Sequence, residues 1–226
     1  MSTFISNIGG WSLVFQYLGA NALLGLLPPL IGLLLSVPVG IACVRWRGAY
    51  PPVLSLTSAL YAIPSLAFFV ILIAYTGLGY LTVIIPLTVF SLCILVPNVV
   101  DGLRSVAEPV RQAATAMGYG QLRRLAQVEL PIAIPVILAG LRVAVVSSIS
   151  LASLGTLIGV SSLGFFFIDG EQRTYPAEIW FSIGLILLLA MVADLLLVIA
   201  GRLLTPWLRG RRSYVPPALR IKAATQ

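Results

Sequence analysis

The chain of 226 residues is 59% hydrophobic and only 9% charged, and its mean hydropathy is +1.05. A soluble domain carries about 25% charged residues, so this composition excludes a soluble globular protein and indicates an integral membrane protein. The net charge of +7 would suggest nucleic-acid binding in a soluble protein. Here the basic residues lie at the ends of apolar stretches, which favours a role in membrane orientation and no nucleic-acid partner.

Five apolar runs follow one another along the chain, and each is long enough to cross ~30 Å of hydrocarbon as a helix. They cover residues 21–44, 53–76, 79–100, 131–158 and 179–204. Unbroken runs of this length exclude the short strands of a membrane barrel. The sequence therefore predicts an all-α membrane protein of about five transmembrane helices, with one domain over residues 1–210 and a basic cytoplasmic tail over 211–226.

Two stretches outside these runs remain open to two interpretations. Residues 1–20 are rich in aromatic side chains, which favour the headgroup zone, so we expect an interfacial segment there. Residues 159–178 hold a cluster of charges, and we expect the phenylalanine run 165–167 to dip into the interface. The alternative for either stretch is an extra helix embedded in the membrane.

The distribution of basic residues predicts the orientation. If the loop with Arg45 and Arg47 is cytoplasmic, then segment 101–130 and the residues after 201 are cytoplasmic as well. Only Arg142 and Arg173 of the fourteen basic residues then lie elsewhere. Because cytoplasmic loops carry the excess of Lys and Arg, we expect the N-terminus outside and the C-terminus inside.

Segment 101–130 interrupts the apolar pattern with several arginines and two glutamates. Pro109 suits the first turn of a helix, and the Gly-Tyr-Gly run that starts at Gly118 predicts a helix end and a turn. Residues 121–128 are typical of a second short helix, which we expect Pro131 to end. Two short polar helices between membrane spans predict a docking element for a soluble partner.

The residues needed for catalysis are missing from this sequence. It has no histidine, no phosphate-binding loop, and a single lysine, Lys222, in the tail. Cys43 and Cys93 stand within apolar runs and are expected to be buried hydrophobic residues, with no metal site. We therefore expect no enzyme activity and no cofactor on this chain, so that any ATP and Mg²⁺ would bind to another subunit.

A motif in the polar segment carries a family resemblance. Gln112-Ala113-Ala114 is followed after three residues by Gly118, and after nine more by Val-Glu-Leu-Pro at 128–131. This spacing resembles the "EAA" loop of bacterial ABC importer permeases, in which Glu-Ala-Ala and Gly precede Ile-x-Leu-Pro. Gln112 departs from the glutamate of that motif, and Val128 departs from its isoleucine.

The resemblance implies that the segment forms a coupling helix, which sits in a groove of a cytoplasmic ABC ATPase. It further implies a second permease copy or a related permease, an extracytoplasmic solute-binding protein, and the bacterial cytoplasmic membrane as the location. Small residues permit close approach, and arginines can pair with acidic groups of a partner. The alternative for the arginines is binding to anionic lipid. The candidate contact residues are Arg111, Gln112, Ala113, Ala114, Gly118, Arg123 and Arg124.

Further residues resemble the permeases of glycine betaine and choline, the osmoprotectant subfamily. They are the run Ile63-Pro64-Ser65-Leu66-Ala67 and the segment 154–167. The resemblance implies an importer of a compatible solute such as glycine betaine, choline or carnitine. An importer of amino acids such as methionine remains the alternative within the same family. Outside it, the alternatives are a non-transporting membrane scaffold and, less favoured, an ion-driven transporter.

Quaternary ammonium solutes are attracted to aromatic faces, which makes Tyr61 a candidate for the translocation path. Hydroxyl groups recur at every third position of the fourth run and could line a hydrated translocation path. The alternative for all of these residues is helix packing or hydrogen bonding within one helix. The candidate path residues are Tyr61, Pro64, Ser65, Ser147, Ser150 and Ser153.

Arg142 and Asp194 are the charged residues deepest in the apolar runs. Each lies 11 residues from the inner end of its run, which corresponds to roughly 16 Å of helix. Because buried charges in a membrane are costly unless paired, we expect these two side chains to face each other or to share a polar network. The alternative is that water in the pore solvates the two side chains separately.

Overall fold

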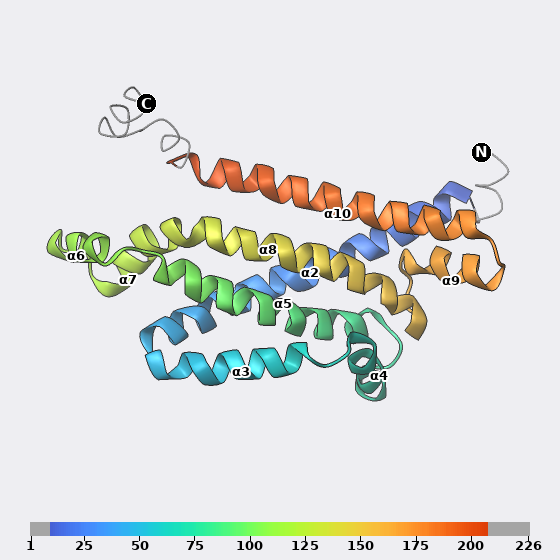
Figure 1. Cartoon of the computed structure of the whole chain (residues 1–226), viewed down its shortest axis with the longest axis horizontal. Coiled ribbons are helices and arrows are strands. Elements are labelled where there is room, and N and C mark those ends of the chain that lie inside the picture. The colour runs from blue at the N-terminus through green and yellow to red at the C-terminus, as the bar shows by residue number, and fades with distance from the viewer. Residues whose placement is uncertain (1–9, 208–226) are drawn as a thin grey trace, which may run out of the picture.

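The computed structural model describes residues 10–207, and within that range every regular element is a helix (Figure 1). The helices are α2 (Gly10–Arg45), α3 (Tyr50–Tyr61), α4 (Ser65–Thr76), α5 (Tyr80–Arg104), α6 (Glu108–Ala116), α7 (Gln121–Arg124), α8 (Leu130–Ala152), α9 (Gly164–Gln172) and α10 (Pro176–Leu204). A π turn (Leu125–Glu129) joins α7 to α8, and a 3-10 turn (Ser153–Ile158) extends α8. The tail 211–226 lies outside the described residues.

Four of the described helical stretches are long and apolar enough to cross a membrane, and a fifth is added if the bent pair α3 and α4 is one span. The four are α2, α5, the continuous helix over 121–158, and α10. The expectation of an all-α protein with about five spans is therefore confirmed.

Helix α2 begins earlier than the sequence predicted. Residues 10–20, expected as a separate interfacial segment, form the first turns of one 36-residue helix. Val14 is buried, and the Tyr17 ring packs on Phe165 and Phe166 of α9 with centroid separations of 4.9 and 5.5 Å. Packing against α9 explains why this aromatic stretch continues the helix and does not lie flat at the interface.

The second apolar run, 53–76, is broken where one span was expected. Helices α3 and α4 meet at an angle of 89° across the residues that end in Pro64. Proline lacks an N–H for the helical ladder and drives the preceding residue out of helical geometry, which accounts for the break. Figure 1 shows α4 turned across the direction of α3.

Helices α2, α5 and α8 form the centre of the bundle through close backbone approaches. A Cβ atom on Gly140 of α8 would lie 2.5 Å from Cγ of Asn98 on α5. A Cβ atom on Gly32 of α2 would lie 2.8 Å from Cβ of Ser91 on α5. Small residues at these crossings let the three helices approach closely, as is common for membrane helices.

The two ends of the bundle differ in character. Helices α6 and α7 project at one end, together with the end of α10, while α9 and the start of α10 lie at the other (Figure 1). Phe166 of α9 is fully buried, and only Phe167 of the run 165–167 is exposed. The expectation that this run dips into the interface is therefore wrong for Phe166, because α9 folds back onto α2 and α10 and buries that ring.

Candidate functional site

The polar end of the bundle is built from α6 and α7, which we call, with the residues that join them to α5 and α8, the two-helix loop (residues 105–129). Pro109 lies in the first turn of α6, where a missing N–H costs nothing. Gly118, at φ +85°, ends the helix in the left-handed conformation that favours glycine. The N–H groups of Gly118 and Tyr119 donate to the carbonyls of Thr115 and Ala114 at 3.0 and 3.1 Å. This Schellman motif confirms the helix end predicted at Gly118.

Pro131 does not end the second short helix, contrary to the sequence prediction. Residues 121–158 form one continuous helical stretch. The wider π turn Leu125–Glu129 precedes the proline, and the Leu130 N–H donates to the Leu125 carbonyl. The extra residue in this turn changes the hydrogen-bond register just before the residue that has no N–H to donate. The two-helix loop is therefore continuous with α8.

The outer surface of the loop exposes both polar and apolar groups. Gln112, Ala113 and Gly118 are exposed, whereas Ala114 lies on the buried face of α6 and is not available to a partner. Met117 and Leu122 are 69% and 81% exposed, although they stand on a charged element. Large apolar side chains exposed on the polar end of the bundle are typical of a protein–protein contact. The sequence pattern did not single out these two residues.

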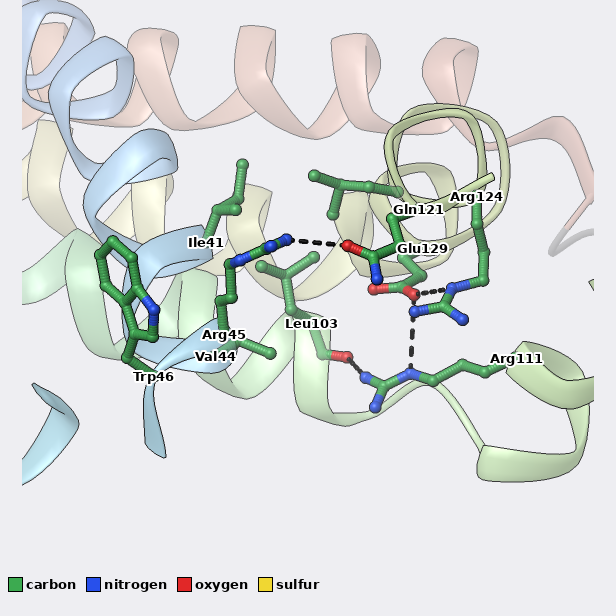
Figure 2. A pocket seen from close by; sticks show the side chains of 10 residues that line it. Ile41, Val44, Arg45, Trp46, Leu103, Arg111, Gln121, Arg124 and Glu129 are labelled. Carbon is green, nitrogen blue, oxygen red and sulfur yellow. Dashed lines mark hydrogen bonds and ion pairs between the residues drawn. The ribbon is translucent and has the colours of Figure 1, made fainter. Parts of the chain in front are cut away.

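Arg111 and Arg124 both contact Glu129, which is 6% exposed (Figure 2). Arg124 Nε donates to Glu129 Oε1 at 2.8 Å, and Arg111 Nε lies 3.9 Å from the same oxygen. These two arginines, expected to meet acidic groups of a partner, are thus paired within the chain. Sequence reasoning missed Glu129, although a carboxylate between Val128 and Leu130 was a sign of a buried charge needing a partner.

Arg123 differs from its two neighbours because it is exposed. Its guanidinium lies 4.7 Å from the Tyr119 ring centroid, and its Nε donates to Gln127 Oε1 at 3.0 Å. Beside the Glu129 contacts is a cavity of about 480 Å³, across which Arg45 of α2 donates to Gln121 Oε1 at 3.0 Å (Figure 2). The end of α2 is thereby linked to α7.

Some of the candidate path residues come together and others do not. Tyr61 is exposed, and its ring meets Phe90 edge-on at a centroid separation of 6.0 Å. Tyr61, Phe90 and Ser147 line a cavity of about 10 Å³ with Ser148, whose buried hydroxyl has no protein partner. Such a cavity holds about one water molecule, which would satisfy the hydroxyl.

The remaining path candidates do not line this cavity. Pro64 and Ser65 form the corner between α3 and α4. The hydroxyl of Ser150 donates to the Val146 carbonyl and that of Ser153 to the Ser150 carbonyl, both within their own helix. Of the four candidate serines, only Ser147 lines the cavity beside Tyr61.

Arg142 of α8 faces Asp194 of α10 in a two-bond ion pair. Arg142 Nε donates to Asp194 Oδ1 at 2.6 Å, and Nη2 donates to Oδ2 at 2.8 Å. Parallel N–H···O bonds of this kind fix both side chains in one plane. The pair thus joins α10 to α8 at mid-span depth, beside the apolar packing of Ala190 and Ala193.

Fold and site together define a multi-pass helical membrane permease. The chain belongs to the family of binding-protein-dependent transport system inner membrane components, whose sequence model matches residues 32–210. It is thus a transport component of the membrane.

Several relatives align over almost the whole chain. The glycine betaine/carnitine/choline transport system permease protein OpuCD of Bacillus subtilis (strain 168) is 31% identical, over 95% of this chain and 93% of its own. The osmoprotectant import permease protein OsmW of Salmonella typhimurium (strain LT2) is 34% identical, over 86% and 91%. The choline transport system permease protein OpuBD of Bacillus subtilis is 33% identical, over 86% and 87%. These matches confirm the resemblance to osmoprotectant importer permeases.

A solved structure supports the same fold. A chain of the MetNI methionine ABC transporter in its inward-facing conformations superposes with a TM-score of 0.69, over 85% of this chain and 94% of that one. The sequences are 20% identical, so the likeness is one of fold alone.

Proposed function

We propose that this chain is the permease subunit of an ATP-driven importer for a quaternary ammonium solute, such as glycine betaine, choline or carnitine. The observation that carries the solute class is the near full-length similarity, at 31–34% identity, to permeases named for these solutes and for osmoprotectants. Likeness to the methionine transporter extends to the fold only, so an amino acid is the less supported cargo.

The two-helix loop is the proposed contact for a separate ABC ATPase, which would bind ATP and Mg²⁺. Its support is the exposed surface formed by Gln112, Ala113, Arg123 and the apolar side chains Met117 and Leu122. A further support is a hollow of about 490 Å³ along α6. An element of this shape can carry a rigid-body displacement from a soluble subunit into the membrane helices.

The proposed orientation places the two-helix loop in the cytoplasm of a bacterium. Arg45, Arg104 and Arg202 lie at the loop end of the bundle, and the positive-inside rule assigns that end to the cytoplasm. The opposite end, with α9, would then face the extracytoplasmic solute-binding protein. A second permease copy or a related permease would complete the pathway, since four or five spans are few for a pathway in one subunit.

The solute path is proposed to run beside Tyr61, at the corner between α3 and α4. The exposed Tyr61 ring rests on buried Phe90 next to Ser147, and aromatic faces attract diffuse positive charge. A proline corner also frees backbone carbonyls that can be hydrated.

Reconstitution tests this proposal. The chain is assembled in vesicles with its ATPase and binding protein, and ATP hydrolysis is measured with glycine betaine, choline or methionine. Stimulation by a quaternary ammonium solute supports the proposal, and stimulation by methionine alone reassigns the cargo. A scaffold that does not transport would leave hydrolysis unchanged with every solute. Labelling of Ala116→Cys from outside intact cells would overturn the orientation.

A further inference from the structure

Glu129 is the most deeply buried carboxylate of the two-helix loop, and it lies where the loop joins the membrane helix α8. It is the last residue of the π turn, directly before α8. Its side chain is 8% exposed and accepts a bond from Arg124 Nε at 2.8 Å, with Arg111 Nε at 3.9 Å. A single carboxylate therefore holds two guanidinium groups that come from two different helices.

The two arginines extend the contacts of Glu129 to the other elements. Arg111 Nη2 donates to the Leu103 carbonyl in the last turn of α5 at 2.6 Å. Arg124 Nη1 donates to Thr115 Oγ1 on α6 at 3.0 Å. Figure 2 shows the Leu103 carbonyl, Arg111, Glu129 and Arg124 in one continuous chain of interactions. This network connects α5, α6, α7 and the π turn that leads into α8.

Apolar packing holds the loop helices only weakly. Ala114 is the one buried residue of α6, and α7 has none. In contrast, the helices beneath the loop pack tightly: a Cβ atom on Gly102 of α5 would lie 3.1 Å from the Ala133 carbonyl oxygen of α8. Apart from Val106 before α6 and Leu125 in the π turn, which pack as apolar residues, the polar network is thus the main link between the loop helices and the tightly packed helix pair.

We propose that Glu129 is the positioning residue that fixes the two-helix loop relative to α5 and α8. With the carboxylate in place, a displacement of the loop moves both helices together. Without it, the two guanidinium groups lose the buried charge that they share, and Arg111 keeps only the exposed Glu108 carboxylate, at 3.8 Å from Nη1, as an acidic partner, which favours rearrangement of the loop. The inference rests on the proposed function in one respect, since the ATPase is the subunit that would displace the loop.

A spin label tests the positioning role without any partner. Cys43 and Cys93 are buried, so a label on exposed Ala116→Cys at the end of α6 is selective. Glu129→Gln is expected to shift the spectrum toward a more mobile component. The matched control is Asp101→Asn, which removes a carboxylate from an exposed position at the same end of α5 and leaves the spectrum unchanged. A Glu129→Gln spectrum identical to that of the wild type overturns the proposal.

The assembled transporter tests the consequence for coupling. Glu129→Gln is expected to lower the number of solutes moved per ATP by about threefold, with the ATPase still co-purifying. An unchanged ratio overturns the proposal, whereas Asp101→Asn keeps the wild-type ratio. If the wild-type complex shows no solute-stimulated hydrolysis, the proposed function fails, and the spin-label result still decides the role of Glu129. If Glu129→Gln does not assemble, Arg124→Gln takes its place, because it interrupts the same network while Arg111 still pairs with the carboxylate. A more mobile label and fewer solutes moved per ATP support the proposal, and wild-type values of both overturn it.

Discussion

Arg142 and Asp194, 52 positions apart in the sequence, join α8 to α10 through two hydrogen bonds of 2.6 and 2.8 Å. Their side chains remain 42% and 32% exposed. A charged pair at mid-span depth is costly in contact with lipid chains, so protein or water must cover it in the membrane. The pair therefore marks a face of the bundle that hydrocarbon does not solvate.

Removal of either partner is expected to destabilise the protein. Asp194→Asn or Arg142→Gln leaves one charge unpaired within the span, and we expect a loss on the order of 1 to 2 kcal/mol. Thermal unfolding in detergent measures the loss. The double variant Arg142→Gln/Asp194→Asn should recover most of the stability, because it leaves no unpaired charge. Wild-type stability in both single variants would show that the pair contributes nothing.

Gly118→Ala is expected to disrupt the turn between α6 and α7. Alanine at φ +85° is strained by roughly 1 to 2 kcal/mol, which would loosen the Schellman motif. Co-purification of the ATPase should fall, measured as the amount retained by the tagged permease. Gly120→Ala is the matched control, because Gly120 has φ −65° and no atom within 4 Å of an added Cβ. Equal retention by both variants would count against a docking role for this turn.

Gly140→Ala is expected to separate α5 from α8. The new Cβ would lie 2.5 Å from Cγ of Asn98, and such overpacking costs about 1 to 3 kcal/mol. A lower unfolding temperature in detergent is the expected result. Gly184→Ala on α10 is the control, since no atom lies within 4 Å of its added Cβ and alanine favours a helix. If both variants unfold at the wild-type temperature, the close approach at Gly140 is not required.

Tyr61→Leu is expected to slow the uptake of a quaternary ammonium solute by roughly fivefold, the equivalent of about 1 kcal/mol of cation–π attraction. Tyr61→Phe keeps the aromatic face and should transport at close to the wild-type rate. Uptake of labelled solute into vesicles is the measurement. Tyr75→Leu is the control, because Tyr75 is 85% exposed at the far end of α4. A Tyr61→Leu variant with normal uptake would remove this residue from the path.

Much of the fold follows from the sequence because membrane helices are specified by long apolar runs. The runs 131–158 and 179–204 lie within observed helices, run 79–100 begins one residue before α5, and Gly118 ends α6 where its residue type indicated. Arg142 and Asp194 were singled out because each is a charge at a similar depth in an apolar run. In each case the signal is local composition or spacing.

The remaining features depend on contacts that spacing does not encode. Pro64 indicates a break, but the angle of 89° depends on how α4 packs against α5. The internal pairing of Arg111 and Arg124 depends on the π turn that brings Glu129 beneath α6 and α7. The burial of Phe166 likewise depends on α9 folding back onto α2, which no local pattern indicates.

The length of α2 has a mechanical consequence for the molecule. Its 36 residues correspond to roughly 54 Å, well beyond the hydrocarbon thickness, and it touches α9 through Tyr17 and α7 through Arg45. A single helix therefore extends from the α9 end of the bundle to the two-helix loop at the other end. Because Pro28 and Pro29 remove ladder hydrogen bonds near its middle, we expect any bending of α2 between the two faces to concentrate at that turn.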